Sequence, residues 1–376
     1  MKGKVLFAAT VLRGHILVFH LPYMRWFQEQ GYEVHCCARN DTEEETPVVP
    51  YCDRYIDMPF ERSPLHPGNR GVYRQLKTLI DTQDYALIHC HTPVGGSLTR
   101  LAAPDARRRG TRVMYTAHGF HFYDGAPLPN WLLFYPAERM LSRFTDLLVT
   151  INAQDYARAL RFHARETALV AGVGVDTARF GAPVERAAVR ASLGLATDAK
   201  VVMTVGEHIP RKNHATCLHA IAAAPEATLI FCGVGEQTQA LMAQAKHLGV
   251  AHRVLFLGFR RDVAALLGAA DAFLFPSLQE GLPVSLMEAM AAGLACVVSR
   301  VRGNTDLITD GVGGYLCAPM DAAAMAAALT RILQDAEMAA AMGAHNREAI
   351  KAYSLPVVEE RMARLYLAQL DKREAT

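Results

Sequence analysis

The chain has 376 residues, 51% of them hydrophobic, and a formal net charge of +2 at neutral pH. This length exceeds what one ordinary hydrophobic core needs and predicts two domains. The near balance of charge gives a nucleic-acid role no electrostatic support. The eight cysteines are scattered without a C-x-x-C pair, so the sequence indicates neither a zinc site nor a disulfide framework. A reducing cytoplasm is the expected compartment.

Hydropathy gives no indication of a membrane span. The first apolar run, residues 5–10, is too short for a signal peptide, and no later stretch approaches the roughly 18 to 20 apolar residues that a membrane helix needs. We therefore expect a soluble protein, or one bound to a membrane surface at most.

The first half of the chain alternates short apolar runs with helical patterns. The runs that we expect to be strands are residues 5–9, 34–38, 87–90, 113–116 and 147–151, with a loop over residues 10–15. Such alternation indicates a parallel α/β sheet with helices on both faces. Residues 1–170 are therefore predicted to form a doubly wound, Rossmann-like domain.

The same alternation restarts in the second half. The predicted strands are residues 201–205, 227–232, 254–257, 272–275, 295–299 and 314–316. Residues 170–183, rich in Gly and Val and without a helical period, are the expected linker, and residues 171–355 the second domain. A helical pattern from residue 356 to about 370 is expected to cross back to the first domain, which would then include 356–376. Ligands of such sheets bind beyond the carboxyl ends of the strands, so two facing domains would share one cleft.

Residues 276–290 join a predicted strand to a helix that is expected to begin near Leu282, with Pro283 in its first turn. The free amides of a first helical turn favour an anion such as a phosphate. Glu280 and Glu288 frame this helix start, and each would need a neutral hydroxyl group to bind. A nucleotide sugar offers a diphosphate flanked by ribose and sugar hydroxyls. The alternative is an ordinary amphipathic helix with a solvated glutamate.

The loop after the first strand contains Gly14 and His15, where a phosphate or sugar could approach the backbone. It is not a G-x-G-x-x-G loop, which weakens an oxidoreductase hypothesis. Gly14 as a simple turn residue is the alternative.

Histidines follow two further predicted strands. His91 and Thr92 follow one, His118 and His121 follow the next, and side chains at such strand ends often face a ligand. His91 and His118 are candidates for holding substrate hydroxyls or stabilising developing charge. A metal site is not predicted, because no carboxylate or third ligand stands at a fixed spacing. The alternative is hydrogen-bonded loop histidines, and for His89 it is packing.

Residues 130–144 combine aromatic and aliphatic side chains with arginines. A membrane interface suits this composition, but apolar residues surround too much of the helix for a surface role alone. A core helix is the favoured prediction, and an acceptor groove or a lipid-facing patch is the alternative.

The loop after strand 201–205 carries Gly206, Glu207, Arg211 and Lys212. The two cations stand where a positive charge could meet a diphosphate. By itself the loop is typical of a solvated turn. Together with the helix near Leu282, which is expected on the same sheet edge, it favours a phosphate site.

Several segments together resemble one known family. They are residues 210–214 (Pro-Arg-Lys-Asn-His) after the strand that ends in Gly206, residues 231–235, residues 257–260, the Glu280 and Glu288 pair, and residues 89–93 and 116–121. They resemble the retaining glycosyltransferases of family 4, which have the GT-B fold of two Rossmann-like domains facing across a cleft. The resemblance spans almost the whole chain. Its first half is similar to the bacterial branch that builds capsule, exopolysaccharide and other surface glycans.

The resemblance implies roles for single residues. Glu288 would bind the ribose hydroxyls, Glu280 the transferred sugar, and Lys212 with Arg211 the departing diphosphate. The residues implied in donor binding are Gly14, Gly206, Arg211, Lys212, Phe259, Arg260, Glu280, Gly281, Leu282, Pro283, Val284 and Glu288. The implied catalytic residues are His118, Lys212 and Glu280, and the acceptor-side residues are His15, His91, Thr92 and His121.

One position departs from the family pattern. Many members have an arginine directly after the glycine of this loop, whereas this chain has Glu207. A glutamate cannot clamp a diphosphate, so Arg211 or another cation must compensate, or Glu207 serves the acceptor or the architecture.

The resemblance implies a retaining, metal-independent transferase without a cofactor, which moves a hexose or N-acetylhexosamine from a UDP-sugar to a glycan acceptor. In this branch the acceptor is commonly a polyprenyl-diphosphate-linked saccharide at the inner membrane face. A cytoplasmic enzyme is expected, and a peripheral contact with the inner face of the plasma membrane through residues 130–144 is the alternative to a core helix there. The alternatives are a sugar-nucleotide epimerase or phosphorylase on the same scaffold, and a non-catalytic nucleotide-sugar-binding protein.

Overall fold

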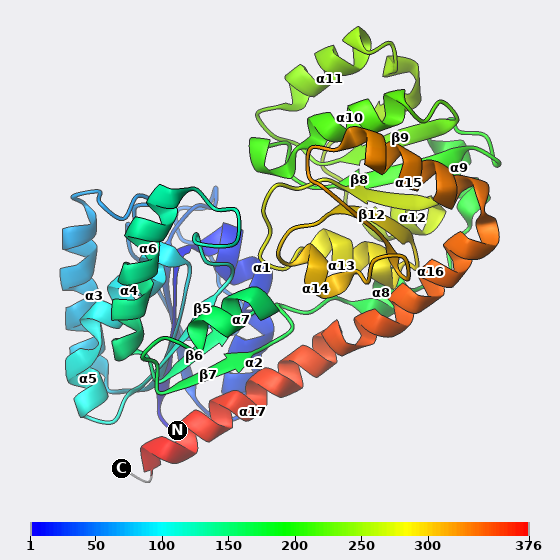
Figure 1. Cartoon of the computed structure of the whole chain (residues 1–376). Helices are drawn as coiled ribbons and strands as arrows, with labels where there is room; N and C mark the ends of the chain where they lie inside the picture. Colours follow the sequence, from blue (N-terminus) through cyan, green and yellow to red (C-terminus); the bar gives the residue numbers. More distant parts are fainter. Residues whose placement is uncertain (1, 375–376) are drawn as a thin grey trace. The chain divides into compact units, whose positions relative to one another are not determined.

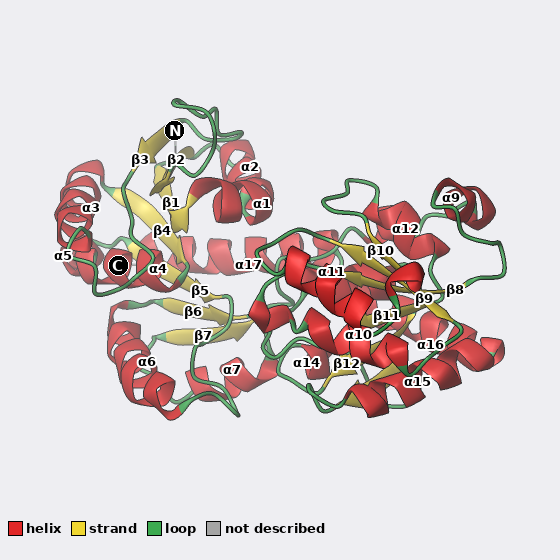
Figure 2. Cartoon of the chain, turned by 90° about the horizontal axis from the view of Figure 1, so that it is seen from above, coloured by secondary structure: helices red, strands yellow, loops and turns green. Residues whose placement is uncertain are grey.

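The computed structural model describes residues 2–374. The chain divides into two compact units, one of Met1–Val173 with Val358–Thr376 and one of Gly174–Val357. Each unit is a parallel β-sheet covered by helices on both faces (Figures 1 and 2). The doubly wound α/β class predicted from the alternating pattern is therefore confirmed.

The first unit has a seven-stranded sheet with the order β3-β2-β1-β4-β5-β6-β7 and parallel pairing throughout. Its strands are β1 Lys4–Val11, β2 Glu33–Arg39, β3 Arg54–Asp57, β4 Tyr85–His91, β5 Arg112–Ala117, β6 Leu147–Thr150 and β7 Glu166–Leu169. The sequence did not predict β3 and β7. Both are short, partly exposed edge strands, so neither needs the continuous apolar run that marks a central strand.

The helices of the first unit are α1 Leu17–Phe19, α2 Leu21–Glu29, α3 Asn69–Gln83, α4 Pro93–Ala102, α5 Pro104–Arg108, α6 Leu128–Leu141 and α7 Ala153–Ala159, with a 3-10 turn at Ser142–Phe144. The predicted loop over residues 10–15 is wrong, because β1 continues to Val11 and a π-helical turn covers Leu12–Ile16. Thr10 stays in the strand, where its amide donates to Thr92 Oγ1 at 3.0 Å.

The second unit has a six-stranded parallel sheet with the order β10-β9-β8-β11-β12-β13. Its strands are β8 Lys200–Val205, β9 Ala227–Cys232, β10 Val254–Phe256, β11 Ala272–Phe275, β12 Ala295–Ser299 and β13 Gly314–Cys317. In both sheets the strand order reverses beside the first strand, between β1 and β4 and between β8 and β11. The carboxyl ends of strands at such a reversal are the usual ligand site of this architecture.

The helices of the second unit are α8 Thr177–Phe180, α9 Arg186–Ser192, α10 His214–Ala222, α11 Thr238–His247, α12 Val263–Ala269, α13 Val284–Ala291, α14 Asn304–Leu307, α15 Ala322–Gln334 and α16 Ala336–Ala349, with 3-10 turns at Pro210–Lys212, Ala251–Arg253 and Ile350–Tyr353. The expectation that residues 170–183 lack a helix is wrong. Asp176 caps the short helix α8 by accepting from the Arg179 amide, a local signal that hydrophobic periodicity does not detect.

The last helix, α17 Leu355–Glu374, packs into the core of the first unit. Its side chains Val358, Met362, Tyr366 and Leu370 are all buried there, at spacings of four residues that place them along one helix face. Tyr366 also hydrogen-bonds to His89 on β4. The first unit therefore needs the end of the chain to complete its core.

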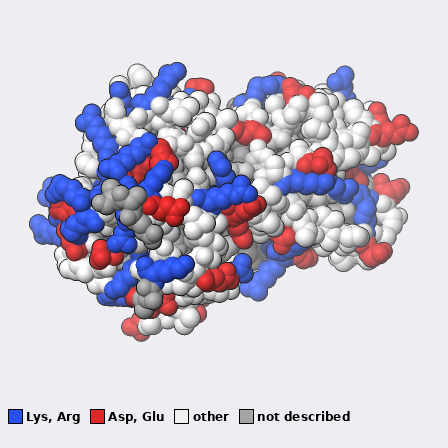
Figure 3. Space-filling view, turned by 90° about the horizontal axis from the view of Figure 1, so that it is seen from below, with Lys and Arg blue, Asp and Glu red and all other residues white. Residues whose placement is uncertain are grey.

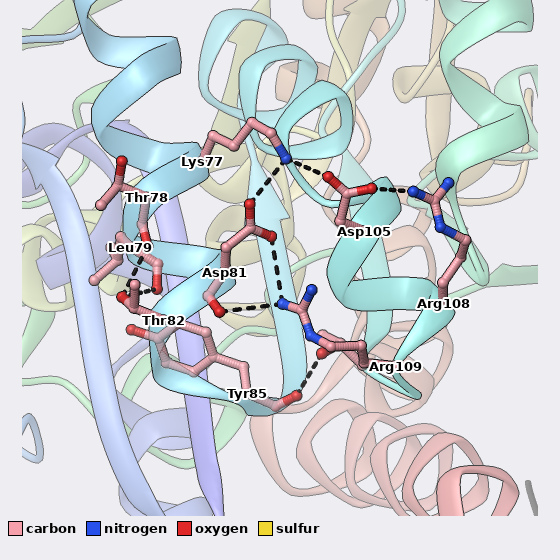
Figure 4. A network of polar contacts seen from close by, with 10 residues as sticks. Lys77, Thr78, Leu79, Asp81, Thr82, Tyr85, Asp105, Arg108 and Arg109 are labelled. Carbon is pink, nitrogen blue, oxygen red and sulfur yellow. Dashed lines mark hydrogen bonds and ion pairs between the residues drawn. The ribbon is translucent and has the colours of Figure 1, made fainter.

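A network of charged side chains joins α3 to α5 in the first unit (Figure 4). Lys77 Nζ donates to Asp81 Oδ2 at 2.8 Å and to Asp105 Oδ2 at 2.5 Å. Arg108 pairs with Asp105, and Arg109 lies 3.3 Å from Asp81 Oδ1. These pairs fix two surface helices against each other, away from the carboxyl ends of the strands.

The charged side chains on one face do not form the single-sign patch that is typical of nucleic-acid binding (Figure 3). On the face drawn in Figure 3, Lys and Arg side chains intermingle with Asp and Glu. This mixture fits the near-neutral net charge of the whole chain. In residues 2–374, no helix has both the length and the apolar character needed to cross a membrane.

Candidate active site

An ion pair organises the carboxyl end of the second sheet. Lys212, in the turn after β8, donates to Glu280 Oε1 at 2.7 Å, and Ser277 Oγ donates to the same oxygen at 2.5 Å. Arg211 NH1 lies 3.2 Å from this oxygen and donates to the Gln279 carbonyl at 2.9 Å. The structure thus brings together the two cations and the glutamate that the sequence placed on one sheet edge.

Lys212 and Glu280 are both largely withdrawn from water. Glu280 is 6% exposed, and the Lys212 ammonium lies 4.7 Å from the centroid of the Phe275 ring. Burial lowers the pKa of Lys212, while Glu280 opposes that change. A lysine has three N–H donors and Glu280 uses one of them, so Lys212 can also bind a phosphate oxygen.

Helix α13 begins beside this ion pair. Pro283 is its N-cap with φ −78° and ψ 118°, so the helix starts at Val284, slightly later than the predicted start near Leu282. No side chain caps the first turn, which leaves its amides available to an anion. Gly303 fits against this loop because a Cβ atom there would lie 2.6 Å from the Gly281 carbonyl oxygen.

Glu288 lies inside α13 and is partly buried. Burial raises its pKa from 4.5 to about 7, and Arg179 only partly offsets this effect. The carboxyl group is therefore poised near its titration point at neutral pH. A pair of hydroxyl donors would favour the ionised form and lower the pKa again.

The loops after β8 and β9 approach each other closely. A Cβ atom on Gly233 would lie 1.9 Å from the Gly206 carbonyl oxygen, so only glycine fits at residue 233. Glu207, beside this contact, is exposed, and its negative charge favours the charged form of Lys212. Phe259 is 73% exposed, and Arg260 forms an ion pair with Asp262. Phe259 is therefore accessible, and Arg260 is partly so.

In the first unit, two amides of the π-helical turn after β1 already have an acceptor. The Arg13 amide donates to Asp41 Oδ1 at 2.5 Å and the Gly14 amide to Asp41 Oδ2 at 3.2 Å. Sequence reasoning missed Asp41. A phosphate would have to displace this carboxylate to reach the two amides.

The histidines of the first unit gather at the carboxyl ends of β1, β4 and β5. The rings of His15 and His118 lie 4.7 Å apart, and His91 Nδ1 lies 3.4 Å from His118 Nε2. His20, which the sequence did not single out, stacks on His91 with a centroid distance of 3.7 Å. His89 instead packs with both ring nitrogens bonded, to Tyr366 and Thr116, as its predicted packing role requires.

Beside this group lies an apolar cavity of about 650 Å³. Its lining includes the predicted acceptor residues Thr92 and His121, and also Gly119, directly after His118. Apolar side chains supply most of the remaining wall, namely Val11, Pro64, Leu65, Pro93, Val94, Phe120, Phe122, Leu133, Phe134, Ala137 and Leu141. Such a cavity suits an elongated hydrocarbon group with a polar end.

Helix α6 supplies part of the cavity wall and corrects one prediction. Residues 130–144 were expected to form a core helix, but Leu141 is the one fully buried side chain of α6. Leu128 and Leu132 are 68% and 70% exposed, while Phe134 packs partly against the core. The helix therefore covers the cavity on one side and presents leucines to solvent on the other.

Comparisons with known proteins decide the family. The model described as Glycosyltransferase Family 4 matches residues 23–179, and the model described as Glycosyl transferases group 1 matches residues 185–349. The putative glycosyltransferase EpsD of Bacillus subtilis (strain 168) is 40% identical over 379 residues, which cover 99% of this chain and 98% of EpsD. The chain is a family 4 glycosyltransferase.

Two further relatives extend this result. One relative is an Escherichia coli protein named UDP-Gal:alpha-D-GlcNAc-diphosphoundecaprenol alpha-1,3-galactosyltransferase. The glycosyltransferase is 27% identical to it over 317 residues, which cover 78% of this chain and 79% of the Escherichia coli protein. The crystal structure of Anabaena HepE in complex with UDP matches it with a TM-score of 0.80 and 21% identity, over 97% of this chain and 100% of HepE. The GT-B fold that the resemblance implied is therefore confirmed.

Tertiary contacts in this glycosyltransferase give partners to residues for which the sequence predicted no role. Arg302, 5% exposed, donates from Nε to the Glu280 carbonyl oxygen at 2.9 Å. Asn213, with φ +53°, donates to the Pro276 carbonyl at 3.0 Å and so links the loops after β8 and β11. Ser277 lies two residues after the predicted strand 272–275, and this position was the one available signal. Nothing in the local sequence around Arg302 indicates its partner.

Proposed function

We propose that this glycosyltransferase moves a hexose or N-acetylhexosamine from a UDP-sugar to a lipid-linked saccharide with retention of the anomeric configuration. The observation that carries the donor part is the arrangement of Lys212, Glu280 and the uncapped first turn of α13 at the strand-order reversal of the second sheet. Cations and amides for a diphosphate stand there beside a buried carboxylate for sugar hydroxyls.

The relatives support the choice of substrates. The name of the Escherichia coli relative specifies a UDP-sugar donor and a diphosphoundecaprenol acceptor, and Anabaena HepE was crystallised with UDP. The apolar cavity of the first unit would hold the first isoprene units of such an acceptor, with Thr92 and His121 at its polar side. The synthesis of a cell-surface polysaccharide is the process that this pair of substrates serves.

The proposed reaction is a front-face displacement. The bond between sugar C1 and the β-phosphate oxygen breaks, a bond from C1 to the acceptor oxygen forms, and the departing diphosphate takes the proton of the acceptor hydroxyl. Lys212, Arg211 and the amides after Gly281 would stabilise the charge on the leaving UDP, so no metal is expected at the diphosphate and no cofactor is needed. His118 would contact the transferred sugar, and Glu288 would bind the ribose.

The proposal is tested in two stages. A thermal-shift screen of UDP-, GDP- and ADP-sugars identifies the donor, and the product formed with a polyprenyl-diphosphate saccharide is analysed by NMR for its anomeric configuration. An α-linked product from an α-configured UDP-sugar is expected. Stabilisation by GDP- or ADP-sugars alone, or an inverted product, would contradict the proposal.

Glu280→Ala is expected to abolish transfer, because it removes both the sugar contact and the partner that fixes Lys212. Glu226→Ala, at an exposed position of the same unit, is the matched control and should keep the parent activity. Full activity of Glu280→Ala would remove this residue from the site.

The rival activities predict other outcomes. An epimerase or phosphorylase on the same scaffold would consume the UDP-sugar without any glycan acceptor. A non-catalytic binding protein would bind the donor and produce nothing with any acceptor, a hypothesis that the intact set of Lys212, Glu280 and Glu288 disfavours. Incubation with and without acceptor, followed by measurement of UDP release, distinguishes the three.

A further inference from the structure

Four histidines from separate elements of the first unit converge on one point. His15 lies in the π-helical turn after β1, His20 at the start of α2, His91 at the end of β4 and His118 after β5. One ring nitrogen from each lies within 4.8 Å of those from the other three. We refer to these residues as the four-histidine cluster.

Several nitrogens of this cluster are buried without a hydrogen-bond partner. They are His15 Nε2, His91 Nε2 and both ring nitrogens of His20. Buried polar atoms are normally satisfied, and an orphaned one calls for an explanation such as an ion. His89 is the internal comparison, because it packs against His91 while Tyr366 and Thr116 satisfy both of its nitrogens. The orphaned atoms therefore belong to the cluster and not to histidines of this region in general.

The burial of the rings is compatible with a cation as the missing partner. His15, His20 and His91 are buried and His118 is partly buried, and burial disfavours the charged form of an imidazole. Neutral imidazole, with one free lone pair, is the form that binds metals.

The spacing of one pair of nitrogens matches a tetrahedral cation site. Zn–N bonds of about 2.0 to 2.1 Å at tetrahedral angles place the ligand nitrogens about 3.3 Å apart. His91 Nδ1 and His118 Nε2 lie 3.4 Å apart as a hydrogen-bonded pair, a spacing that a cation between them could keep, while the unpaired nitrogen of His91 is its Nε2. The stacked ring of His20 must rotate away from His91 to complete the set. A phosphate accepts N–H bonds at about 2.9 Å through several oxygens, so it would hold the nitrogens farther apart.

We propose that His15, His20, His91 and His118 together bind one divalent transition-metal cation, with Zn²⁺ as the first candidate. Imidazole suits Zn²⁺, and four protein ligands without an open position are typical of a structural site. The cation would tie the turn Leu12–Ile16 and the start of α2 to the ends of β4 and β5. Ligation occupies one nitrogen of His118 and leaves the other for a substrate. The proposal is independent of the donor and the acceptor.

Metal binding is tested on the full chain without an affinity tag, after treatment with a chelator and dialysis. Calorimetric titration with ZnCl₂ should give one site per chain, and Zn²⁺ should raise the melting temperature.

His20→Ala should weaken this binding by at least about 100-fold, since even the loss of an outer-shell partner costs 10- to 100-fold. His35→Gln is the control, because His35 is buried in the same sheet but bonds to Tyr85 and Glu33 outside the cluster. It should bind Zn²⁺ like the parent.

Cobalt substitution gives a readout that does not depend on a folded variant. Co²⁺ in the cluster should show the strong d–d absorption of a tetrahedral site without thiolate-to-cobalt charge transfer, which separates it from sites at the eight cysteines. Equal Zn²⁺ affinity in the parent and in His20→Ala would overturn the proposal. So would weak octahedral or thiolate-type cobalt spectra, or a melting temperature raised by inorganic phosphate and not by Zn²⁺.

Discussion

At the scale of single residues, the contact between Lys212 and Glu280 gives the candidate site its electrostatic character. Each side chain is largely withdrawn from water and holds the other in place, with Ser277 donating to the same carboxylate oxygen. A buried charge that lost its partner would be strongly disfavoured. The pair therefore fixes the position of Lys212 before any donor arrives. Charge stabilisation of this preorganised kind acts mainly on the transition state.

Lys212→Ala is expected to lower the turnover number by about 100- to 1,000-fold, the range for removing one preorganised charge-stabilising donor. Donor affinity should fall much less, because Arg211 and the α13 amides remain. Turnover at saturating donor is compared with donor affinity from calorimetry. Lys246→Ala, at an exposed position on α11, is the control. Equal turnover in Lys212→Ala and the parent would refute the phosphate role.

Glu288 makes the stability of the protein depend on pH. Its pKa rises from 4.5 to about 7 in the folded state, so the folded protein binds the proton more tightly than the unfolded chain does. The free energy of unfolding should fall as pH rises from 4.5 through 7, by roughly 3 kcal/mol in total for this group. Glu288→Gln removes this titration. Urea unfolding gives the difference in unfolding free energy between Glu288→Gln and the parent. This difference should favour Glu288→Gln more at pH 8 than at pH 5. For the control Glu226→Gln, at an exposed site, the difference in unfolding free energy from the parent should be the same at pH 5 and at pH 8.

At the scale of elements, α6 differs most from its prediction. A helix with apolar residues around most of its circumference is normally buried. Here one side faces the apolar cavity while Leu128 and Leu132 are exposed on the other. Exposed leucines on a helix that also carries Arg139 are typical of an interfacial helix. This arrangement supports the alternative of a lipid-facing patch at residues 130–144.

Leu132→Glu is expected to weaken binding to anionic phospholipid vesicles several-fold while leaving the melting temperature unchanged, because Leu132 is 70% exposed. Vesicle flotation measures the bound fraction. The control is Leu160→Glu, at a residue that is 59% exposed outside α6. Equal flotation of both variants and the parent would argue against a membrane contact at α6.

The close approach of the loops after β8 and β9 gives a second test at this scale. Gly233→Ala places a Cβ atom 1.9 Å from a backbone oxygen, so the backbone must move. We expect it to lose at least about 2 kcal/mol of unfolding free energy and to bind the donor more weakly. Gly71→Ala is the control, since α3 leaves open space there and alanine favours a helix. A Gly233→Ala protein as stable as the parent would show that the loops can separate freely.

At the scale of the whole molecule, the end of the chain completes the core of the first unit. Residues 358–376 belong to this unit although 184 residues of the second unit, Gly174–Val357, precede them. Tyr366 is fully buried, packs near Phe27 and donates to or accepts from His89 Nδ1 at 2.8 Å. The first unit therefore cannot complete its core until α17 has been synthesised.

Tyr366→Phe is expected to destabilise the first unit by about 1 to 3 kcal/mol, because His89 keeps its place but loses a hydrogen-bond partner. Tyr366→Ala should lose about 3 to 5 kcal/mol through the cavity it leaves. Urea unfolding of both variants measures these losses. Leu367→Ala, at an exposed position on the same helix, should stay near the parent value. If Tyr366→Ala were as stable as Leu367→Ala, α17 would not be part of the core.

The sequence by itself determined the class of fold, the central strands and the family. Central parallel strands are buried on both faces and need continuous apolar runs, which one sequence displays directly. The adjacency of the loops with Lys212 and Glu280 was also predictable, because both follow strands of one parallel sheet. Only the tertiary structure revealed the edge strands β3 and β7, the exposed side of α6, and the contacts of Arg302 and Asp41. It alone brought His20 to His15, His91 and His118, because their convergence depends on the order of β1, β4 and β5 in the sheet, and strand order is fixed by packing between distant segments.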